Sequence, residues 1–166
     1  MIRFTIPGEP QGKGRPRVGR VGAHVRMFTP AKTAAYEGLV AHAAQAAMVG
    51  RDLLKGACRI ELDVVCTVPA SWSGKKQREA ISGAIHPTKK PDADNVLKAI
   101  CDGINGVVWV DDTQAVVVAM RKRYGNVPGV CVIVDEIDAK AEAQREMEVF
   151  AFTTAPTATS GRQTSR

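Results

Sequence analysis

The sequence predicts an α+β fold, a two-layer sandwich in which a mixed β-sheet packs against helices. Several short segments alternate apolar and polar residues, as half-buried strands do, and two longer segments repeat apolar residues with the period of a helix. The order of these segments along the chain favours helices packed on one sheet. A chain of 166 residues also suits a single core.

The first thirty residues predict short strands around a basic loop. Residues 2–6 alternate as a strand. Residues 7–22 are so rich in Gly, Pro and Arg that no regular element is expected there. Residues 25–28 predict another short strand.

Two helices are predicted from apolar periodicity. Thr29 and Pro30 precede an alanine-rich helix over residues 31–48, and its apolar face would pack on the sheet. A second helix starts at Asp94 and ends near Gly103 and Gly106. Its apolar face consists of Val96, Leu97, Ile100, Cys101 and Ile104.

Three further strands are predicted over residues 57–68, 114–124 and 129–137. The last two are expected to form a hairpin, because only a short turn-like segment separates them. Within residues 71–89 we expect a short polar helix from 73 to 84.

The last two segments of the sequence are predicted to form a surface helix and a tail. Residues 139–148 are expected to form a surface helix. Residues 153–166 are rich in Ser and Thr, which predicts a disordered tail after a domain over residues 1–152.

Charge points to a polyanionic partner. The net charge is +6 and the pI is about 9.4, and neutralised phosphates release counterions. In the loop containing Lys13, Arg15 and Arg17, glycines allow close approach of the backbone to phosphates, and the three cations suit a sugar-phosphate backbone. The alternative is a merely solvated loop.

Cysteines and hydropathy exclude several classes. The four cysteines lie in apolar segments without zinc-site spacing, which predicts reduced core residues. The amino terminus is too short for a signal peptide, and no apolar run has the length of a membrane span. We therefore expect a cytoplasmic protein without a membrane partner.

An acidic block is the feature most indicative of chemistry. Asp92 and Asp94 are two residues apart beside a proline, so an extended backbone would turn both carboxylates to one side. Asp94, Lys98 and Asp102 then recur every four residues on the polar face of the helix. Clustered oxygen ligands beside a cation suit a hard divalent metal and a phosphate.

A second acidic pair follows the helix. A helix flanked by strands can return Asp112 to the end that carries Asp92 and Asp94, but adjacent strand residues face opposite ways. One of Asp111 and Asp112 is thus expected to reach the metal, and periodicity does not say which. The competing interpretation is an N-cap and a turn, which explains the whole combination poorly.

The block has a recognisable pattern, which consists of Lys90, Pro91, Asp92, Asp94, Asn95, Lys98, Asp102, Asn105, Gly106, Trp109, Asp111, Asp112, Thr113 and Gln114, followed by Lys122, Arg123, Tyr124 and Gly125. With these residues the chain resembles the RusA-type endodeoxyribonucleases, Holliday junction resolvases common in phages and prophages. The likeness covers residues 1–137, and the loop over residues 8–17 is similar to that of the phage branch. The same α+β fold is expected from the resemblance.

The resemblance also implies the roles of site residues. Asp92, Asp94 and Asp112 would be the ligands of Mg²⁺, with Mn²⁺ as a substitute, and Lys98 would be the catalytic lysine. Asp102 is expected to hold Lys98 through an i,i+4 pair.

Further implications concern substrate and assembly. Asp111 is a lesser, outer candidate at the metal, and the residues expected to bind DNA are Lys13, Arg15, Arg17, Lys89 and Lys90. The expected activity is resolution of four-way DNA junctions by two symmetric cuts, made by a homodimer in a bacterial or phage-infected cell.

Two other functions remain open at this point. One is a catalytically inactive protein of the same fold that binds junction DNA. The other is a metal-dependent phosphoryl-transfer enzyme acting on nucleotides, for which the basic loop would be superfluous.

Overall fold

The computed structural model describes residues 1–21 and 24–138, with the backbone alone at residues 17, 19–21 and 24–26. Residues Met1–Glu136 form one compact unit. The predicted helix over residues 139–148, the tail and the domain boundary at residue 152 lie outside the described residues.

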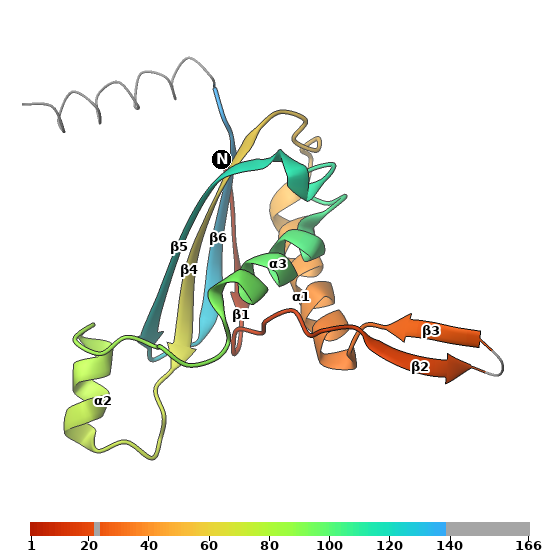
Figure 1. Ribbon diagram of the computed structural model, residues 1–166. Helices are drawn as coiled ribbons and strands as arrows, with labels where there is room; N and C mark the ends of the chain where they lie inside the picture. The colour runs from red at the N-terminus through yellow and green to blue at the C-terminus, as the bar shows by residue number, and fades with distance from the viewer. Residues whose placement is uncertain (22–23, 139–166) are drawn as a thin grey trace, which may run out of the picture. The chain divides into compact units, whose positions relative to one another are not determined.

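A four-stranded mixed sheet is the framework of the fold (Figure 1). Its strands lie in the order β1-β6-β4-β5; pairing is antiparallel between β1 and β6 and between β6 and β4, and parallel between β4 and β5. This arrangement confirms the predicted α+β sandwich with a mixed sheet. The strand bounds are β1 Ile2–Pro7, β4 Cys58–Thr67, β5 Ala115–Gly125 and β6 Gly129–Glu136.

Alternation along β4 sets the inner face of the sheet. Ile60, Leu62 and Val64 are buried, whereas Asp63 points to the other face. Leu62 pairs with Val132 of β6, which is also buried, so apolar side chains from neighbouring strands lie side by side. The period-two pattern of the sequence therefore becomes one continuous apolar surface.

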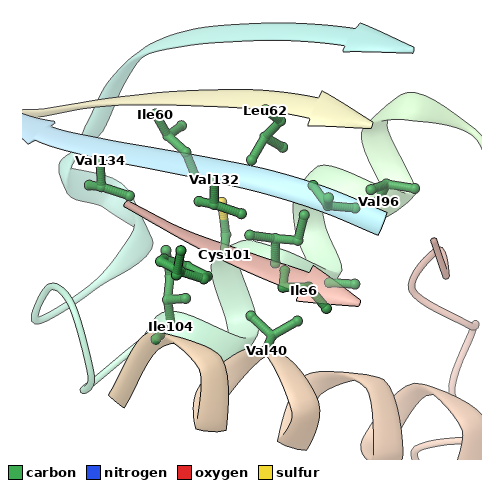
Figure 2. Packing of buried hydrophobic residues seen from close by; sticks show 14 of the residues in the cluster. Ile6, Val40, Ile60, Leu62, Val96, Cys101, Ile104, Val132 and Val134 are labelled. Atoms are coloured by element: carbon green, nitrogen blue, oxygen red, sulfur yellow. The ribbon is translucent and has the colours of Figure 1, made fainter. Parts of the chain in front are cut away.

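Two helices cover that surface: α1, Ala31–Met48, and α3, Ala93–Ile104. Figure 1 shows both on the same side of the sheet, and Figure 2 shows their side chains meeting those of the strands. The labelled contacts are Val40 from α1, Val96, Cys101 and Ile104 from α3, and Ile6, Ile60, Leu62, Val132 and Val134 from the sheet. Burial of this α3 face leaves its opposite, polar face outside the core.

Two predictions about strands are wrong. Residues 7–22 are not without regular structure, because β2, Arg17–Val21, pairs antiparallel with β3, His24–Phe28. Hydrogen bonds between β2 and β3 satisfy the backbone N–H and C=O groups of both strands. Local composition does not predict this pairing. The strand expected near residues 25–28 is confirmed.

The predicted hairpin between residues 114–124 and 129–137 is also wrong, because β4 lies between β5 and β6. Strands two places apart are about 10 Å apart, and three linking residues can span that distance. A short connection therefore did not require the two strands to be neighbours.

The segment before the acidic block forms a helix, α2, Gly74–Ile81, slightly shorter than predicted. Ser73 caps its start through a hydrogen bond from the backbone N–H of Lys76. Trp72 packs edge-on against Tyr124 of β5, with ring centroids 5.4 Å apart. The Lys76 ammonium lies 4.1 Å from the centre of the Trp72 ring. These contacts hold α2 against the sheet.

All four cysteines are free thiols, and Cys58, Cys66 and Cys101 are buried, as expected for reduced core residues. Burial, the larger cause, raises the pKa of the Cys101 thiol to about 11. That thiol is therefore protonated and unreactive at neutral pH.

The close packing of α1 against Gly103 of α3 gives a stability prediction. A Cβ atom at Gly103 would lie 2.8 Å from the Val40 Cβ and 3.1 Å from the Glu37 carbonyl oxygen. Gly103→Ala should therefore destabilise the fold by about 1 to 2 kcal/mol, because overpacking outweighs the gain in helix propensity. Urea unfolding measures this.

The matched control is Gly38→Ala in α1, where an added Cβ meets nothing within 4 Å. It should stabilise the protein by about 0.5 to 1 kcal/mol. Equal effects at the two glycines would contradict the close packing of α1 on α3.

Candidate active site

The polar face of α3 carries the acidic block. Asp92 is the N-cap residue and Asp94 lies in the first turn, and both are exposed. The partial positive charge of the helix amino terminus offsets part of their mutual repulsion. Lys98 and Asp102 follow at one-turn intervals on the same face.

Capping does not account for Asp92. Its side chain accepts no capping hydrogen bond from the helix. Its contact with Asn95 is long, with the amide nitrogen 3.5 Å from the carboxylate Oδ2. Among the described residues, Asp94 has no ion-pair partner. These two carboxylates thus retain oxygen atoms that can serve as ligands.

Lys98 joins the second acidic pair to α3. Its ammonium lies 2.7 Å from Asp112 Oδ2 and 2.9 Å from Asp102 Oδ1. The Asp112 carboxylate is therefore held beside the Lys98 and Asp102 side chains on the polar face of α3. The contact between Lys98 and Asp102 is the i,i+4 pair expected from the sequence.

The choice between the two adjacent aspartates follows from a short 3₁₀ turn, η1, Asp112–Gln114. Asp111 caps this turn, and its Oδ1 accepts a hydrogen bond from the Thr113 backbone N–H at 3.0 Å. Hydrogen bonds from the Thr113 side chain and backbone lower the pKa of the Asp111 carboxyl. Asp111 therefore shapes the turn, and Asp112 is the residue that contacts α3.

Gln114 fixes this turn to the rest of the molecule. Its side-chain oxygen accepts hydrogen bonds from the backbone N–H groups of Val110 and Asp111, at 2.8 and 3.1 Å. Its amide nitrogen donates to the carbonyls of Leu54 and Gly56, at 3.1 and 2.8 Å. Four hydrogen bonds that involve this one side chain therefore hold the turn that carries Asp112.

Lys13 connects the basic loop to the same face of α3. Its ammonium donates to Asp102 Oδ2 and lies 2.8 Å from Glu37 Oε1 of α1. Its backbone N–H donates to the carbonyl of Asn95 at 2.8 Å. The loop is thus docked on both helices, and Asp102 lies between two ammonium groups.

The charges of this network reinforce one another. Partial burial raises the pKa of Asp102, but the hydrogen bonds from Lys13 and Lys98 outweigh it and place the pKa below its usual value. Desolvation lowers the pKa of Lys13, but its hydrogen bonds to Asp102 and Glu37 outweigh this effect, so the pKa lies above its usual value. Since the pKa of Lys98 is also raised, Asp102, Lys13 and Lys98 all stay charged at neutral pH.

Two features of this network were not predicted from the sequence. We expected Lys13 to contact DNA, whereas its ammonium has two carboxylate partners within the protein; its contact with DNA stays a prediction. For Glu37 the sequence left open a supporting carboxylate of the site or a salt bridge; the structure shows a salt bridge, and its partner Lys13 was not predicted, because the sequence does not show that a loop residue reaches α1.

The other predicted DNA-binding residues are less constrained. The side chains of Arg15, Lys89 and Lys90 are exposed. The backbone of residues 89–91 is held to β5, because the Lys122 ammonium donates to the carbonyls of Lys89 and Pro91, at 3.0 and 2.7 Å. Arg17 begins β2, and only its backbone is described.

The donor set suits a hard cation, although it is not gathered around a common point. Carboxylate oxygens are the ligands that Mg²⁺ prefers. Within residues 1–21 and 24–138, no group of three or more His, Cys, Asp or Glu side chains is arranged to hold a metal ion. The structure brings Asp112 to Lys98 and Asp102, and it does not unite Asp112 with Asp92 and Asp94.

The chain matches the family described as Endodeoxyribonuclease RusA over residues 7–135. It is also similar to the uncharacterized protein YqaN of Bacillus subtilis (strain 168), with 34% identity over 140 residues, which cover 83% of this chain and 98% of that protein.

The chain therefore belongs to the RusA endodeoxyribonuclease family. This confirms the resemblance drawn from the acidic block, and assignment to the phage branch stays a prediction. In the part of the chain that the structure describes, no helix combines the length and apolar character needed to span a bilayer.

The network predicts a pH-dependent stability. Asp102→Asn, studied in EDTA at pH 7, should destabilise the protein by about 2 kcal/mol, between the values typical of exposed and buried pairs. Because the folded pKa of Asp102 is depressed, its contribution is present above the unfolded pKa of about 3.9 and is lost as pH falls through the folded pKa. Urea unfolding at pH 7 and pH 3 measures the difference.

A suitable control is Asp52→Asn, since Asp52 is exposed and lies outside this network. It should change stability by less than about 0.5 kcal/mol at either pH. An Asp102→Asn effect that is equally large at pH 7 and pH 3 would contradict the ion-pair account.

Proposed function

We propose that this protein is a metal-dependent, structure-specific endodeoxyribonuclease that resolves four-way DNA junctions by paired symmetric hydrolysis. Family membership supports an endodeoxyribonuclease. The observation that carries the proposal is the Lys98 ammonium, which is held between the Asp102 and Asp112 carboxylates on the helix that also carries Asp94. A permanent cation beside two carboxylates supports a site that acts on a phosphate.

We assign Asp92, Asp94 and Asp112 as the residues that would hold Mg²⁺, with Mn²⁺ as a substitute. When bound, the metal would supply a polarised phosphate oxygen and an activated water. The exposure of Asp92 and Asp94 leaves room for a phosphate and for water at this end of the helix. Asp111 supports the assignment indirectly, by shaping the turn that presents Asp112.

Lys98 supplies positive charge and does not act as a base. Hydrogen bonds to Asp112 and then Asp102 raise its pKa well above the ordinary lysine value, so it stays protonated at neutral pH. A protonated lysine in a fixed position stabilises negative charge that develops on a phosphate during hydrolysis. Asp102 gives it a second anchor that does not depend on Asp112.

Binding of DNA would depend on the basic loop and on the segment before α3. Arg15, Lys89 and Lys90 are exposed, and the net charge of the chain is +6. Lys13 and Arg17 complete the proposed set, with Lys13 also docking the loop on α3. Since a four-way junction has two-fold symmetry and needs two cuts, we further propose that a homodimer acts on it, in the cytoplasm of a bacterial or phage-infected cell.

The direct experiment offers the full chain a synthetic four-way junction in Mg²⁺ or in EDTA. Two symmetric cuts in Mg²⁺ and none in EDTA are expected. Junction binding without cleavage in Mg²⁺ would favour an inactive binding protein instead. Competition by free nucleotides stronger than that by junction DNA would favour a nucleotide-specific enzyme.

A single substitution tests the role of the α3 carboxylates. Asp94→Asn should lower the rate of junction cleavage at least about 100-fold, because loss of a metal ligand removes several kcal/mol of transition-state stabilisation. Junction affinity in EDTA should be unchanged or higher, because one negative charge near the phosphates is removed.

The comparison variant is Asp52→Asn, another exposed aspartate outside the site. Its cleavage rate should match that of the wild type. The assignment of Asp94 is wrong if Asp94→Asn cuts the junction at the wild-type rate in Mg²⁺.

A further inference from the structure

A pocket of about 410 Å³ lies beside the acidic site, between the amino-terminal loop and the start of α3. Its volume is within the range of about 300 to 1,000 Å³ that is typical of small-ligand sites. Asp92 is one of its lining residues, so the pocket adjoins the proposed metal ligands. The lining residues that matter for its chemistry are Glu9, Gln11, Lys90, Pro91, Asp92 and Asn95.

The loop wall of the pocket is fixed in place. The backbone N–H of Lys13 donates to the Asn95 carbonyl at 2.8 Å, and that of Gly14 donates to Thr33 Oγ1 at 3.0 Å. A Cβ atom at Gly12 would lie 3.0 Å from the Asn95 Cβ, so glycine permits the loop to pack this closely. The pocket is therefore a feature of the docked loop and helix.

Two amide side chains give the pocket its recognition chemistry. Gln11 and Asn95 each offer a donor and an acceptor side by side, which is the pattern that pairs with the edge of a nucleobase. Their present hydrogen bonds are long: the Gln11 amide nitrogen is 3.5 Å from the Glu9 carbonyl oxygen, and the Asn95 amide nitrogen is 3.5 Å from the Asp92 carboxylate. Such bonds are weak and easily exchanged for a ligand.

The remaining lining residues favour a base over a free anion. Pro91, which is partly exposed, adds apolar surface that can lie against a planar ring. Asp92 and Glu9 contribute negative charge that would repel a free phosphate. The Lys13 ammonium is already paired with Glu37 and Asp102, which leaves Lys90 as an exposed cation of the lining.

We propose that this pocket receives one unpaired nucleobase of DNA beside the phosphodiester to be cut, with Gln11 and Asn95 contacting its edge. The inference rests on the proposed function, because a branch point is where bases can leave the stack. A base in the pocket places its own backbone next to Asp92. The pocket would thereby give the enzyme a preference for particular nucleotides at the crossover.

The experiment measures binding of the full chain in EDTA to four-way junctions that differ only in the nucleotides flanking the crossover. The wild type should distinguish the best from the worst by about tenfold or more, as expected of one amide pair to a base. Gln11→Ala should reduce this difference to less than about threefold, with an unchanged salt dependence. Gln45→Ala, at an exposed glutamine of α1 outside the pocket, should behave as the wild type.

Cleavage mapping of the same junctions in Mg²⁺ separates this inference from the proposed function. Cleavage with the same nucleotide preference in the wild type and in Gln11→Ala would overturn the pocket assignment and leave the nuclease intact. Nucleotide preference in binding that Gln11→Ala removes, without cleavage by either protein, would support the pocket and overturn the nuclease. Equal wild-type binding of all junctions would overturn the pocket whatever the cleavage result.

Discussion

The organisation of this site depends on one carboxylate, Asp102, which lies between the ammonium groups of Lys13 and Lys98. Through Lys13 it holds the basic loop and α1, and through Lys98 it is linked to Asp112 at the turn before β5. Its side chain is only 19% exposed, so these attractions are less screened than those of a surface pair. One residue thus joins the proposed DNA-binding loop and the proposed catalytic face of α3, which are far apart in the sequence.

The core makes this arrangement possible. The apolar face of α3 packs against the sheet and α1, which leaves Asp94, Lys98 and Asp102 together on the opposite face. Gly103 allows α1 to approach closely enough for Glu37 to reach Lys13. Packing of apolar residues therefore determines where the charges lie, and the ion pairs in turn fix the loop that borders the proposed nucleobase pocket.

The sequence predicted what local periodicity controls. The bounds of α3 and the spacing of its charged face follow from the helical repeat, and the buried face of β4 follows from alternation. It did not predict that β4 separates β5 from β6, because a short connection is compatible with both arrangements. The pair between Lys13 and Glu37, and the choice of Asp112 over Asp111, depend on tertiary contacts and on the hydrogen bonds of Gln114, which no local pattern records.

We propose that Asp112 acts with Asp92 and Asp94 as one cation site, although in the present arrangement the Lys98 ammonium neutralises Asp112. Titration of the full chain with Mn²⁺, followed by electron paramagnetic resonance, tests this directly. The account predicts a bound ion whose affinity falls at least about tenfold in Asp112→Asn, since a charged oxygen ligand is lost. Mn²⁺ affinity that is the same in the wild type and in Asp112→Asn would contradict it.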